Sequence, residues 1–490
     1  MKYGDNAIMG RVLIWLVVAV IFCSRAQAIE TGEEALNVLF ILADDLGAHD
    51  VGCYGTDLIE TPHIDRFARQ ALLFDRAYSP APVCTPTRAS ILTGKHPARL
   101  KMTIWSEGAI NPPKDRALIP GKSYPNLSLN EVTLAEKFRE LGYLTAMIGK
   151  WHLGEAAHGP EAQGFDIAVG GNHWGAPTTF FFPYRGLRSN SEYRYLPGLG
   201  YGTESEYLTD RLTDETIQAI DFAKQKSQPF FIMLNHYAPH TPIEAKPEEE
   251  QRFRELLRAD LNHRNPGYAA MIKSLDDGVG KILRHLEQTK LLQKTVIVFT
   301  SDNGGFIGHD GKRDIAVTSN WPLRSGKSSL YEGGVRVPLI VYWPGKKAMA
   351  QHSDYPVSLT DLHPTLLQAS LPSTRLDQTE VTENIDALDL SPLLDQSNHS
   401  LPNRPIYFHY PHYYHAPLTT PCSSVLKHPW KLIYYYETQR SELYHLAQDP
   451  REQEDIASKE PRKVAELVTD LHRWLKTVEA ELPQPNSATP

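Results

Sequence analysis

Four short apolar runs along the chain each end abruptly at polar residues. They cover residues 38–43, 143–148, 230–234 and 296–300. Strands that are apolar on both sides are typical of a sheet that helices cover on both faces. We therefore predict that these runs are strands of one buried sheet.

Helical patterns lie between these runs, for example over residues 134–141 and 269–286. Strands that alternate with helices indicate an α/β protein with a large, mostly parallel sheet sandwiched by helices. Ligands of such sheets bind beyond the carboxyl ends of the strands. The polar residues that follow the four runs should therefore form one site; they include Asp44, Asp45, Lys150, His152, His240, Asp302 and Asn303.

A smaller C-terminal region follows a polar stretch that contains prolines. It holds short apolar runs at 405–410 and 430–436 and a helical pattern from Pro461. The apolar positions of that pattern fall on one helix face; they are Val464, Leu467, Val468, Leu471, Leu475 and Val478. We predict a small antiparallel sheet covered by one helix. The expected division is a catalytic α/β domain over 29–400 and an α+β subdomain over 401–490.

The N-terminus has the parts of a secretory signal peptide over residues 1–28. Lys2 and Arg11 precede an apolar run at 12–23, which leads to Ala26-Gln27-Ala28. The run is short for a membrane span, which needs about 20 residues. We expect export without a membrane anchor: periplasmic or extracellular in a bacterium, lysosomal or extracellular in a eukaryote. The alternative is that the run stays as an uncleaved anchor.

The composition narrows the class of protein. The 490 residues are 41% hydrophobic and carry a net charge of −8, so nothing points to nucleic acid. An acidic total does not exclude an anionic substrate, because the local field of a pocket matters more. Once Cys23 leaves with the signal peptide, Cys53, Cys84 and Cys422 remain. The odd number points to one thiol with separate chemistry, and Cys84 is the candidate. Pairing of Cys53 with Cys422 stays open.

Two pairs of residues suggest a metal site. Asp44-Asp45 and Asp302-Asn303 offer three carboxylates and an amide oxygen. These hard ligands suit calcium or magnesium better than zinc, and close carboxylates repel each other without a cation. Either pair alone could be ordinary turn residues after a strand. Two such pairs at the ends of buried strands favour the metal.

Cys84 opens the sequence Cys-Thr-Pro-Thr-Arg, which ends at Arg88. The short motif could be only a half-buried cysteine at a helix start. The longer segment 80–99, however, resembles the signature of the sulfatase family. The resemblance continues along nearly the whole mature chain, in segments 37–45, 52–55, 142–154, 239–242, 301–305, 325–338 and 442–457.

This resemblance implies an alkaline-phosphatase-like fold, hydrolysis of sulfate esters and oxidation of Cys84 to formylglycine by a formylglycine-generating enzyme. In that family one hydroxyl of the hydrated aldehyde attacks sulfur, and the second lets the sulfate leave. The modified Cys84 is then both nucleophile and ligand of one calcium ion (Ca2+). The other ligands are Asp44, Asp45, Asp302 and Asn303.

Further roles follow from the same resemblance. Arg88 holds the nucleophile and the metal carboxylates. Lys150 binds sulfate, and His152 takes the proton from the second hydroxyl; on an extended segment the two side chains would face the same way. His240 and Lys327 contact the sulfate and the bridging oxygen. His173 lies in a Gly-rich loop of the kind that often faces a pocket, and is a candidate substrate contact.

Several interpretations remain open. We favour a sulfated carbohydrate, which exported enzymes meet often. The alternatives are a phosphoesterase or phosphonate hydrolase of the same superfamily, and a non-catalytic protein that binds sulfated glycans. The aromatic stretch 407–415 could stack on a sugar or seal the domain interface. Glu332 and Arg336 are expected to form a buried ion pair, and His236 to be structural.

Overall fold

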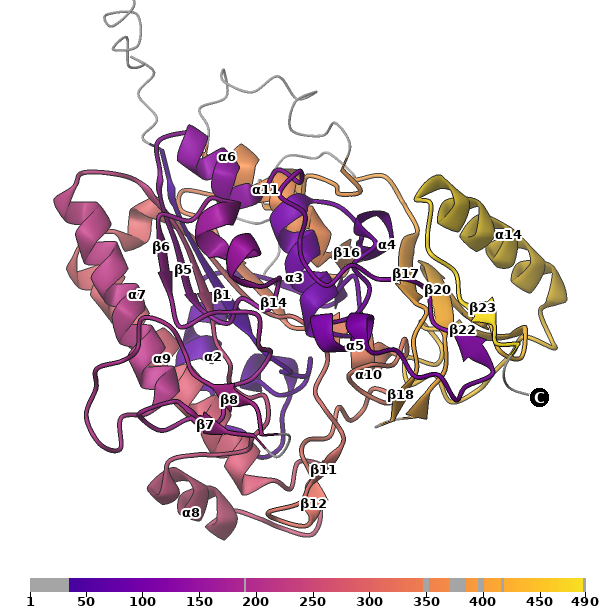
Figure 1. Ribbon diagram of the computed structural model, residues 1–490, viewed down its shortest axis with the longest axis horizontal. Coiled ribbons are helices and arrows are strands. Elements are labelled where there is room, and N and C mark those ends of the chain that lie inside the picture. Colours follow the sequence, from indigo (N-terminus) through magenta and orange to yellow (C-terminus); the bar gives the residue numbers. More distant parts are fainter. Residues whose placement is uncertain are drawn as a thin grey trace, which may run out of the picture.

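The computed structural model describes residues 35–188, 191–346, 352–370, 385–394, 401–415 and 418–487. The predicted signal peptide lies outside these residues. The largest sheet has eight strands in the order β15-β2-β14-β10-β1-β9-β5-β6. Figure 1 labels β14, β1, β5 and β6 of this sheet. These are β15 (His352–Ser353), β2 (Leu72–Phe74), β14 (Leu339–Tyr342), β10 (Thr295–Ser301), β1 (Asn37–Ala43), β9 (Phe230–Asn235), β5 (Leu144–Gly149) and β6 (Ile167–Val169).

The four strands predicted from the apolar runs lie side by side at the centre. They are β10, β1, β9 and β5, all parallel, and all of their residues are buried. Strands β14 and β2 add antiparallel pairs on one side. The sheet is therefore mixed with a parallel centre, and the predicted α/β class is confirmed.

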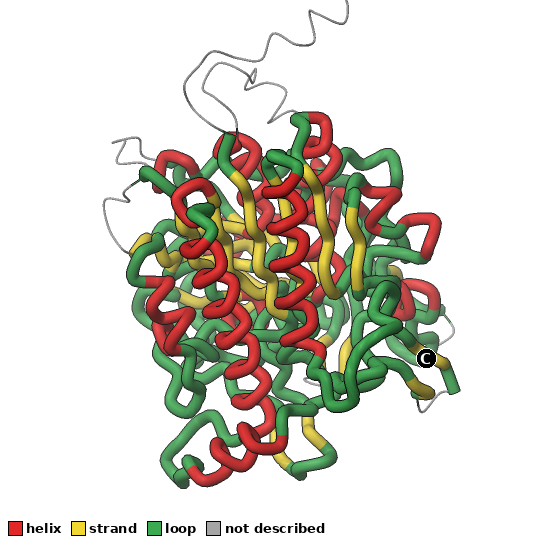
Figure 2. Tube along the Cα trace, turned by 90° about the vertical axis from the view of Figure 1, so that its left-hand side faces the viewer, coloured by secondary structure: helices red, strands yellow, loops and turns green. Residues whose placement is uncertain are grey.

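Helices cover both faces of this sheet. Alternate residues of β1 face opposite sides, so each face presents apolar side chains that helices bury. Leu39 and Ile41 pack in a cluster with α2 (Pro62–Ala68), α7 (Leu208–Gln225) and α9 (Pro266–Gln288). Val38 and Phe40 pack in a second cluster with α3 (Cys84–Thr93), α6 (Leu134–Glu140) and α11 (Leu362–Ser370). Figure 2 shows long helices running in front of the strands.

The C-terminal region has the predicted antiparallel sheet and covering helix. Strands β17 (Ile406–Tyr410), β20 (Cys422–Lys427), β21 (Trp430–Tyr435) and β22 (Arg440–His445) pair in that order. Helix α14 (Pro461–Thr477) buries Leu467, Leu471 and Leu475 against one face. The other face shares a cluster with Val83 and Val335 of the larger domain. The larger domain and this sheet therefore pack through a continuous apolar contact.

A buried ion cluster lies at the same junction. The ammonium of Lys431 lies 2.8 Å from Glu332 and 2.9 Å from Glu452. Arg336 also approaches Glu332, at 3.7 Å, so the expected pair exists, but Lys431 is the closer partner. Burial opposes ionisation of Glu332, yet Lys431 outweighs it and lowers the pKa of that carboxyl.

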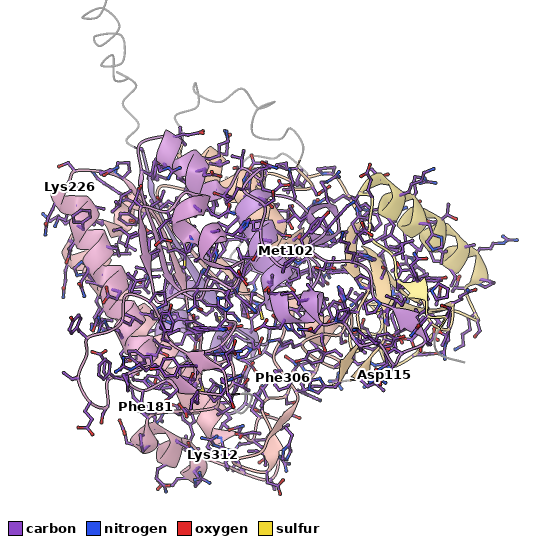
Figure 3. All side chains as sticks on the ribbon, viewed as in Figure 1. Met102, Asp115, Phe181, Lys226, Phe306 and Lys312 are labelled. Carbon is purple, nitrogen blue, oxygen red and sulfur yellow. The ribbon has the colours of Figure 1, made fainter. Side chains whose placement is uncertain are left out.

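Shorter elements complete the described chain, and Figure 3 shows the side chains that pack among them. They are η1 (Gly52–Tyr54), β3 (Ala77–Tyr78), α4 (Pro97–Leu100), α5 (Ser106–Ile110), β4 (Leu118–Ile119), η2 (Ala156–His158), η3 (Pro160–Gln163), β7 (Gly186–Leu187), β8 (Tyr193–Arg194), α8 (Pro247–Glu255), η4 (Leu292–Lys294), β11 (His309–Asp310), β12 (Ile315–Ala316), α10 (Glu332–Val335), β13 (Arg336–Val337), β16 (Val357–Ser358), η5 (Leu359–Asp361), α13 (Ser391–Leu394), β18 (Tyr414–His415), β19 (Leu418–Thr419) and β23 (Gln484–Pro485). Among the residues described, no helix has both the length and the apolar character needed to cross a membrane.

Candidate active site

The carboxyl ends of the central strands meet at one edge of the sheet, as the sequence predicts. Asp44 follows β1 directly, Lys150 follows β5 and Asp302 follows β10. Backbone hydrogen bonds join these ends: the amide of Asp44 donates to the carbonyl of Ala238 at 3.2 Å, and the amide of Lys150 donates to that of Asn235 at 2.8 Å. Polar groups from distant parts of the sequence are therefore buried together.

Ligand atoms for a cation gather at this edge. Atoms of Asp44, Asp45, Cys84 and His240 all lie within 4.8 Å of one another. Asn303 joins the group because its amide donates to Asp45 Oδ1 at 2.8 Å. The remaining oxygens, Asp44 Oδ1 and Asn303 Oδ1, are buried without a hydrogen-bond partner among the described residues. Buried acceptors without donors are what a hard cation would satisfy.

The carboxylates have different electrostatic surroundings. Burial raises the pKa of Asp44 to about 7; Lys150 opposes the rise, and Asp302 and Asp45 add to it. Burial acts in the same sense on Asp45, but there Lys327 and His240 prevail and lower the pKa to about 2. Asp44 is thus the carboxylate whose ionisation most needs additional positive charge.

Three cationic side chains face these three carboxylates. Lys150 Nζ lies 2.6 Å from Asp44 Oδ2, and Lys327 Nζ lies 2.7 Å from Asp45 Oδ1. Arg88 Nε donates to Asp302 Oδ2 at 2.9 Å. All six side chains are buried, so each pair is tightly held in a site from which water is largely excluded.

Cys84 is the first residue of α3, and Arg88 follows one turn later on the same side. The hydroxyl of Thr85 donates to the carbonyl of His152 at 2.9 Å, which ties this helix start to the end of β5. Burial raises the pKa of the Cys84 thiol to about 11, although Lys150 and Lys327 act to lower it. An unmodified thiol here is therefore protonated and a poor nucleophile at neutral pH.

His152 reaches the site by a different route from the one expected. The sequence alone predicts Lys150 and His152 on one face of an extended segment. His152 instead has φ 59, in the left-handed region, so the segment is not extended at that residue. Burial lowers the pKa of His152 well below its usual value, and Lys150 and Arg88 add to the effect. Its imidazole is therefore neutral.

His240 is oriented by its own loop. Its Nδ1 lies 2.7 Å from the carbonyl of Thr241, so Nδ1 carries the hydrogen and Nε2 is the acceptor. Nε2 lies 3.6 Å from Asp45 Oδ2. Burial, together with Lys327, lowers the pKa of His240 to about 3.

The loop that carries His173 lies over the site. The amide of His152 donates to the carbonyl of Asn172 at 2.9 Å, and Gly175 packs against the imidazole of His152. His173 itself is half-buried, and its ring lies 4.6 Å from that of Trp174. The loop is thus placed beside the candidate catalytic residues, while the contact of His173 with a substrate stays a prediction.

Several supporting residues of the site were not predicted from the sequence. Asn235 ends β9 at the same sheet edge and donates to the carbonyl of Lys150 at 3.0 Å. Its position at the end of an apolar run could have placed it in the site from the sequence alone. The hydroxyl of Tyr268 lies 2.9 Å from the carbonyl of Asp45 and 2.6 Å from the carboxylate of Asp50, so its one hydrogen is shared between these acceptors. Asp45 has φ 64, a conformation that this contact helps to hold. No motif links Tyr268 to Asp45, so only the fold reveals the contact.

The cysteines do not form the pair left open above. Cys53, Cys84 and Cys422 are all free. Cys53 packs against the core that includes α9, whereas Cys422 lies in the cluster of the C-terminal sheet. An odd cysteine count therefore gives no reason to single out Cys84. Its position beside Asp44 and Asp45 does.

Comparison with known proteins agrees with this geometry. The model of the Sulfatase family matches residues 36–370, and that of the N-sulphoglucosamine sulphohydrolase C-terminal region matches residues 325–481. N-acetylgalactosamine-6-sulfatase of Homo sapiens is 32% identical over 384 residues, which cover 76% of this chain and 68% of that protein. Arylsulfatase A of Homo sapiens is 33% identical over 405 residues, which cover 77% and 71%.

A solved structure, Ps i-CgsB in complex with k-i-k-neocarrahexaose, superposes with a TM-score of 0.73 at 27% identity; the match covers 90% of this chain and 93% of that one. The chain belongs to the sulfatase family, and its activity is the hydrolysis of sulfate esters. The second family model spans the boundary predicted near residue 400. The division into 29–400 and 401–490 stays a prediction.

Proposed function

We propose that this chain is a calcium-dependent sulfatase that removes sulfate from sulfated carbohydrates by means of a formylglycine made from Cys84. The observation that carries the proposal is the position of Cys84 at the start of α3. Its sulfur lies within 4.8 Å of ligand atoms of Asp44, Asp45 and His240. A residue at that point can act as nucleophile and metal ligand together.

The donor set fits calcium. The ion would be held through the side-chain oxygens of Asp44, Asp45, Asp302 and Asn303. Ca2+ prefers oxygen ligands, whereas zinc sites usually contain nitrogen or sulfur ligands. The unpartnered oxygens Asp44 Oδ1 and Asn303 Oδ1 are the acceptors that support this assignment. When bound, the ion would supply the charge that keeps Asp44 ionised and that polarises an oxygen at position 84.

Conversion of Cys84 by a formylglycine-generating enzyme gives the site the nucleophile that the thiol cannot supply. With a pKa of about 11 the buried thiol stays protonated at neutral pH. A hydrated aldehyde at this position would supply two hydroxyls, one for attack and one whose deprotonation releases sulfate. Arg88, held by Asp302, fixes the same helix turn and keeps the position oriented.

Lys150 and Lys327 would bind the sulfate group. Each ammonium has three donors and uses one or two of them on Asp44 or Asp45. The remaining donors can reach sulfate oxygens, and charge developing there in the transition state would be stabilised in a buried site. This pair explains how a chain with net charge −8 binds an anion.

The two histidines would move protons at opposite ends of the reaction. His152, which is buried and neutral, would take the proton of the second hydroxyl at position 84. His240 presents Nε2 toward Asp45 and would donate a proton to the bridging oxygen of the ester. With its pKa of about 3 it is neutral before substrate binds, so the negative charge of the sulfate ester must raise that pKa before His240 can donate a proton.

Carbohydrate is the favoured substrate class. The human relative is named for a sulfated sugar, N-acetylgalactosamine 6-sulfate, and the related solved structure holds a neocarrahexaose. Either substrate is met by an exported enzyme, which agrees with the proposed signal peptide. The phosphoesterase alternative has a structural relative in a phosphonate monoester hydrolase, whose 18% identity supports a shared fold alone.

The test compares ester types on one enzyme preparation, co-expressed with a formylglycine-generating enzyme. 4-Nitrophenyl sulfate, 4-nitrophenyl phosphate and a panel of sulfated oligosaccharides are assayed with wild type and Cys84→Ala. We expect release of sulfate, little release of phosphate, and loss of turnover in Cys84→Ala. A preparation that prefers phosphate esters, or a fully active Cys84→Ala, would refute the proposal.

A further inference from the structure

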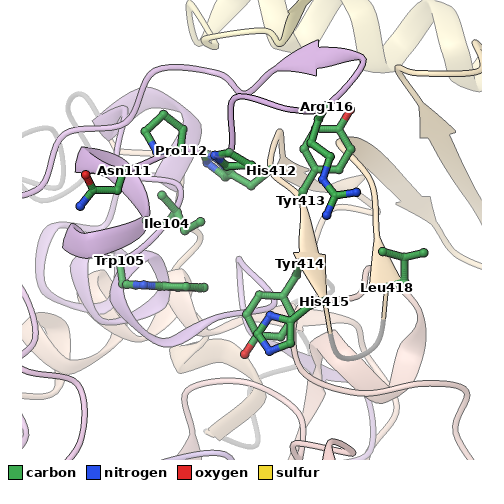
Figure 4. Close-up of a pocket in the computed structure, with 12 residues that line it drawn as sticks. Ile104, Trp105, Asn111, Pro112, Arg116, His412, Tyr413, Tyr414, His415 and Leu418 are labelled. Atoms are coloured by element: carbon green, nitrogen blue, oxygen red, sulfur yellow. The ribbon is translucent and has the colours of Figure 1, made fainter. Parts of the chain in front are cut away.

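The aromatic stretch 407–415 has a structural role where it begins. Tyr407 stacks on Trp474 of α14, with ring centroids 4.5 Å apart. At the other end of the stretch, Tyr414 and His415 line a pocket of about 290 Å³ beside α5 (Figure 4). The first residue therefore helps to seal the C-terminal sheet, and stacking of the last residues on a sugar stays a prediction.

Asp50 is the centre of a buried polar cluster in the loop 44–50, which carries two of the proposed calcium ligands. Its side chain is fully buried. The amide of Gly47 donates to Asp50 Oδ2 at 2.7 Å, and the hydroxyl of Tyr268 lies 2.6 Å from the same oxygen. The amide of Asp50 in turn donates to the carbonyl of Gly47 at 3.1 Å. The carboxylate therefore closes the loop on itself and joins it to α9.

The second oxygen of Asp50 faces two further donors. His263 Nε2 lies 2.9 Å from Oδ1, and the hydroxyl of Thr318 donates to Oδ1 at 3.3 Å. Burial opposes the charge of His263, but Asp50 and Asp57 prevail and raise the pKa of the imidazole to about 9, so it donates from both nitrogens at neutral pH. A carboxylate is acceptor-only, and all four side-chain contacts of Asp50 are with groups that can donate.

Tyr268 extends this cluster to the metal ligand Asp45. Its hydroxyl lies 2.9 Å from the carbonyl of Asp45 as well as 2.6 Å from Asp50 Oδ2. Burial and the charge of Asp50 raise the pKa of Tyr268 well above its usual range, so the hydroxyl keeps its hydrogen. The next amide, that of Leu46, donates to Ser301 Oγ at 3.0 Å. The strained backbone of Asp45, at φ 64, is therefore held between α9 and the end of β10.

Close packing at Gly47 fixes the other side of the loop. A Cβ on Gly47 would stand 2.4 Å from Asn320 Oδ1 and 2.8 Å from Asp50 Oδ2, closer than packed atoms approach. Asn320 Oδ1 also accepts from the amide of Gly305 at 3.0 Å. Gly305 lies two residues after Asn303, so the segments that carry the two pairs of proposed ligands are packed against each other.

We propose that Asp50 is a positioning residue of the calcium site, which acts through Tyr268 to hold Asp45 in the conformation that binds the ion. The inference rests on the proposed function. Asp44 and Asp45 repel each other when no cation is bound, so a loop without this support would relax away from the binding conformation. Binding would then have to order the loop again, at a cost in affinity.

The test measures the dissociation constant (Kd) of Ca2+ by isothermal titration calorimetry on chelator-treated enzyme that was co-expressed with a formylglycine-generating enzyme. The variants are Tyr268→Phe, which removes one hydroxyl and keeps the ring, and Asp50→Asn. The asparagine keeps the shape of the side chain but turns one acceptor into a donor that faces other donors. Tyr207→Phe is the matched control, because Tyr207 is also buried and its hydroxyl donates to a main-chain carbonyl, that of Glu244, at 2.8 Å.

Replacing a group that orients a metal ligand typically weakens metal binding by about 10- to 100-fold. We expect the Kd for Ca2+ to rise about tenfold in Tyr268→Phe and about 100-fold in Asp50→Asn. Tyr207→Phe should keep the wild-type Kd. Both tyrosine substitutions should lower the Tm of the metal-free enzyme, because each removes a buried hydrogen bond, so the Kd separates positioning of the site from a purely structural role.

Two outcomes separate this inference from the proposed function. A wild type that binds Ca2+, with the same Kd in Tyr268→Phe, would overturn this inference alone, and this comparison holds even if Asp50→Asn does not fold. A wild type that binds no Ca2+ would overturn the calcium site of the proposed function and this inference with it.

Discussion

Gly175 lies directly against the imidazole of His152. A Cβ on Gly175 would stand 2.4 Å from Cε1 and 2.6 Å from Nε2 of that ring, closer than packed atoms approach. The amide of His152 is held at the same place by the carbonyl of Asn172. The Gly-rich loop and the imidazole therefore fix each other's position.

Gly175→Ala should displace the His152 ring without removing any catalytic group. Misplacement of a reacting group by about 1 Å can reduce turnover by roughly 100-fold. We expect kcat for the aryl sulfate to fall by about 10- to 100-fold. Gly200→Ala is the control, because nothing lies within 4 Å of a Cβ there. Wild-type kcat in Gly175→Ala would show that the ring has room to move.

The metal prediction concerns Asp302, which contacts Arg88. Asp302→Ala removes a proposed calcium ligand and leaves the buried Arg88 without its closest partner, which costs about 3–5 kcal/mol in typical buried pairs. Activity and Tm should both fall. Chelation of wild type should lower Tm, and Ca2+ should restore it, because a ligand that binds only the folded state stabilises it. A Tm that changes neither with chelator nor with added Ca2+ would count against the calcium site.

A pH-dependent contribution to stability is expected from His263. Its two nitrogens lie 2.9 Å from Asp50 and 2.6 Å from Asp57. Burial acts to lower the pKa of His263, but the two carboxylates prevail and raise it to about 9. Because the folded-state pKa exceeds the unfolded value near 6.5, the protonated histidine stabilises fully below about pH 6.5. That stabilisation disappears as the pH rises through 9.

His263→Gln should therefore lower Tm most at pH 6, where the free energy of unfolding should fall by about 3 kcal/mol. The difference from wild type should shrink toward pH 10. His309→Gln, at an exposed histidine paired with Asp314, is the control and should show no such trend. A Tm difference for His263→Gln that is constant from pH 6 to 10 would contradict the assigned pKa.

The buried cluster at the C-terminal sheet gives a prediction about stability alone. Lys431→Met leaves Glu332 and Glu452 facing each other without their shared cation. We expect a loss of about 3–5 kcal/mol, measured by thermal unfolding. Lys427→Met, at an exposed lysine on the adjacent strand, should change stability little. Equal effects of the two substitutions would mean that the buried cluster adds no stability.

The central sheet could be predicted well because β1, β5, β9 and β10 are mostly apolar, are buried along their whole length, and lead into polar residues. The same strand ends, with the family resemblance, bring together the acidic and basic groups of the site. The left-handed backbone of His152 could not be predicted, because nothing in Lys150-Trp151-His152 requires it. Some contacts join distant segments and depend on the fold. Examples are the hydrogen bond of Tyr268 with Asp45 and the packing of the Arg116 guanidinium over the Tyr413 ring.

The central claim is that Cys84 is converted to formylglycine in the active enzyme, and peptide mass spectrometry tests it most directly. The peptide that contains Cys84 is isolated from active enzyme, with and without an aldehyde-reactive hydrazide. We expect a mass about 18 Da below that of the unmodified cysteine peptide, and a further adduct with the hydrazide. Active enzyme whose Cys84 peptide has the mass of an unmodified thiol, and forms no hydrazide adduct, would contradict the account.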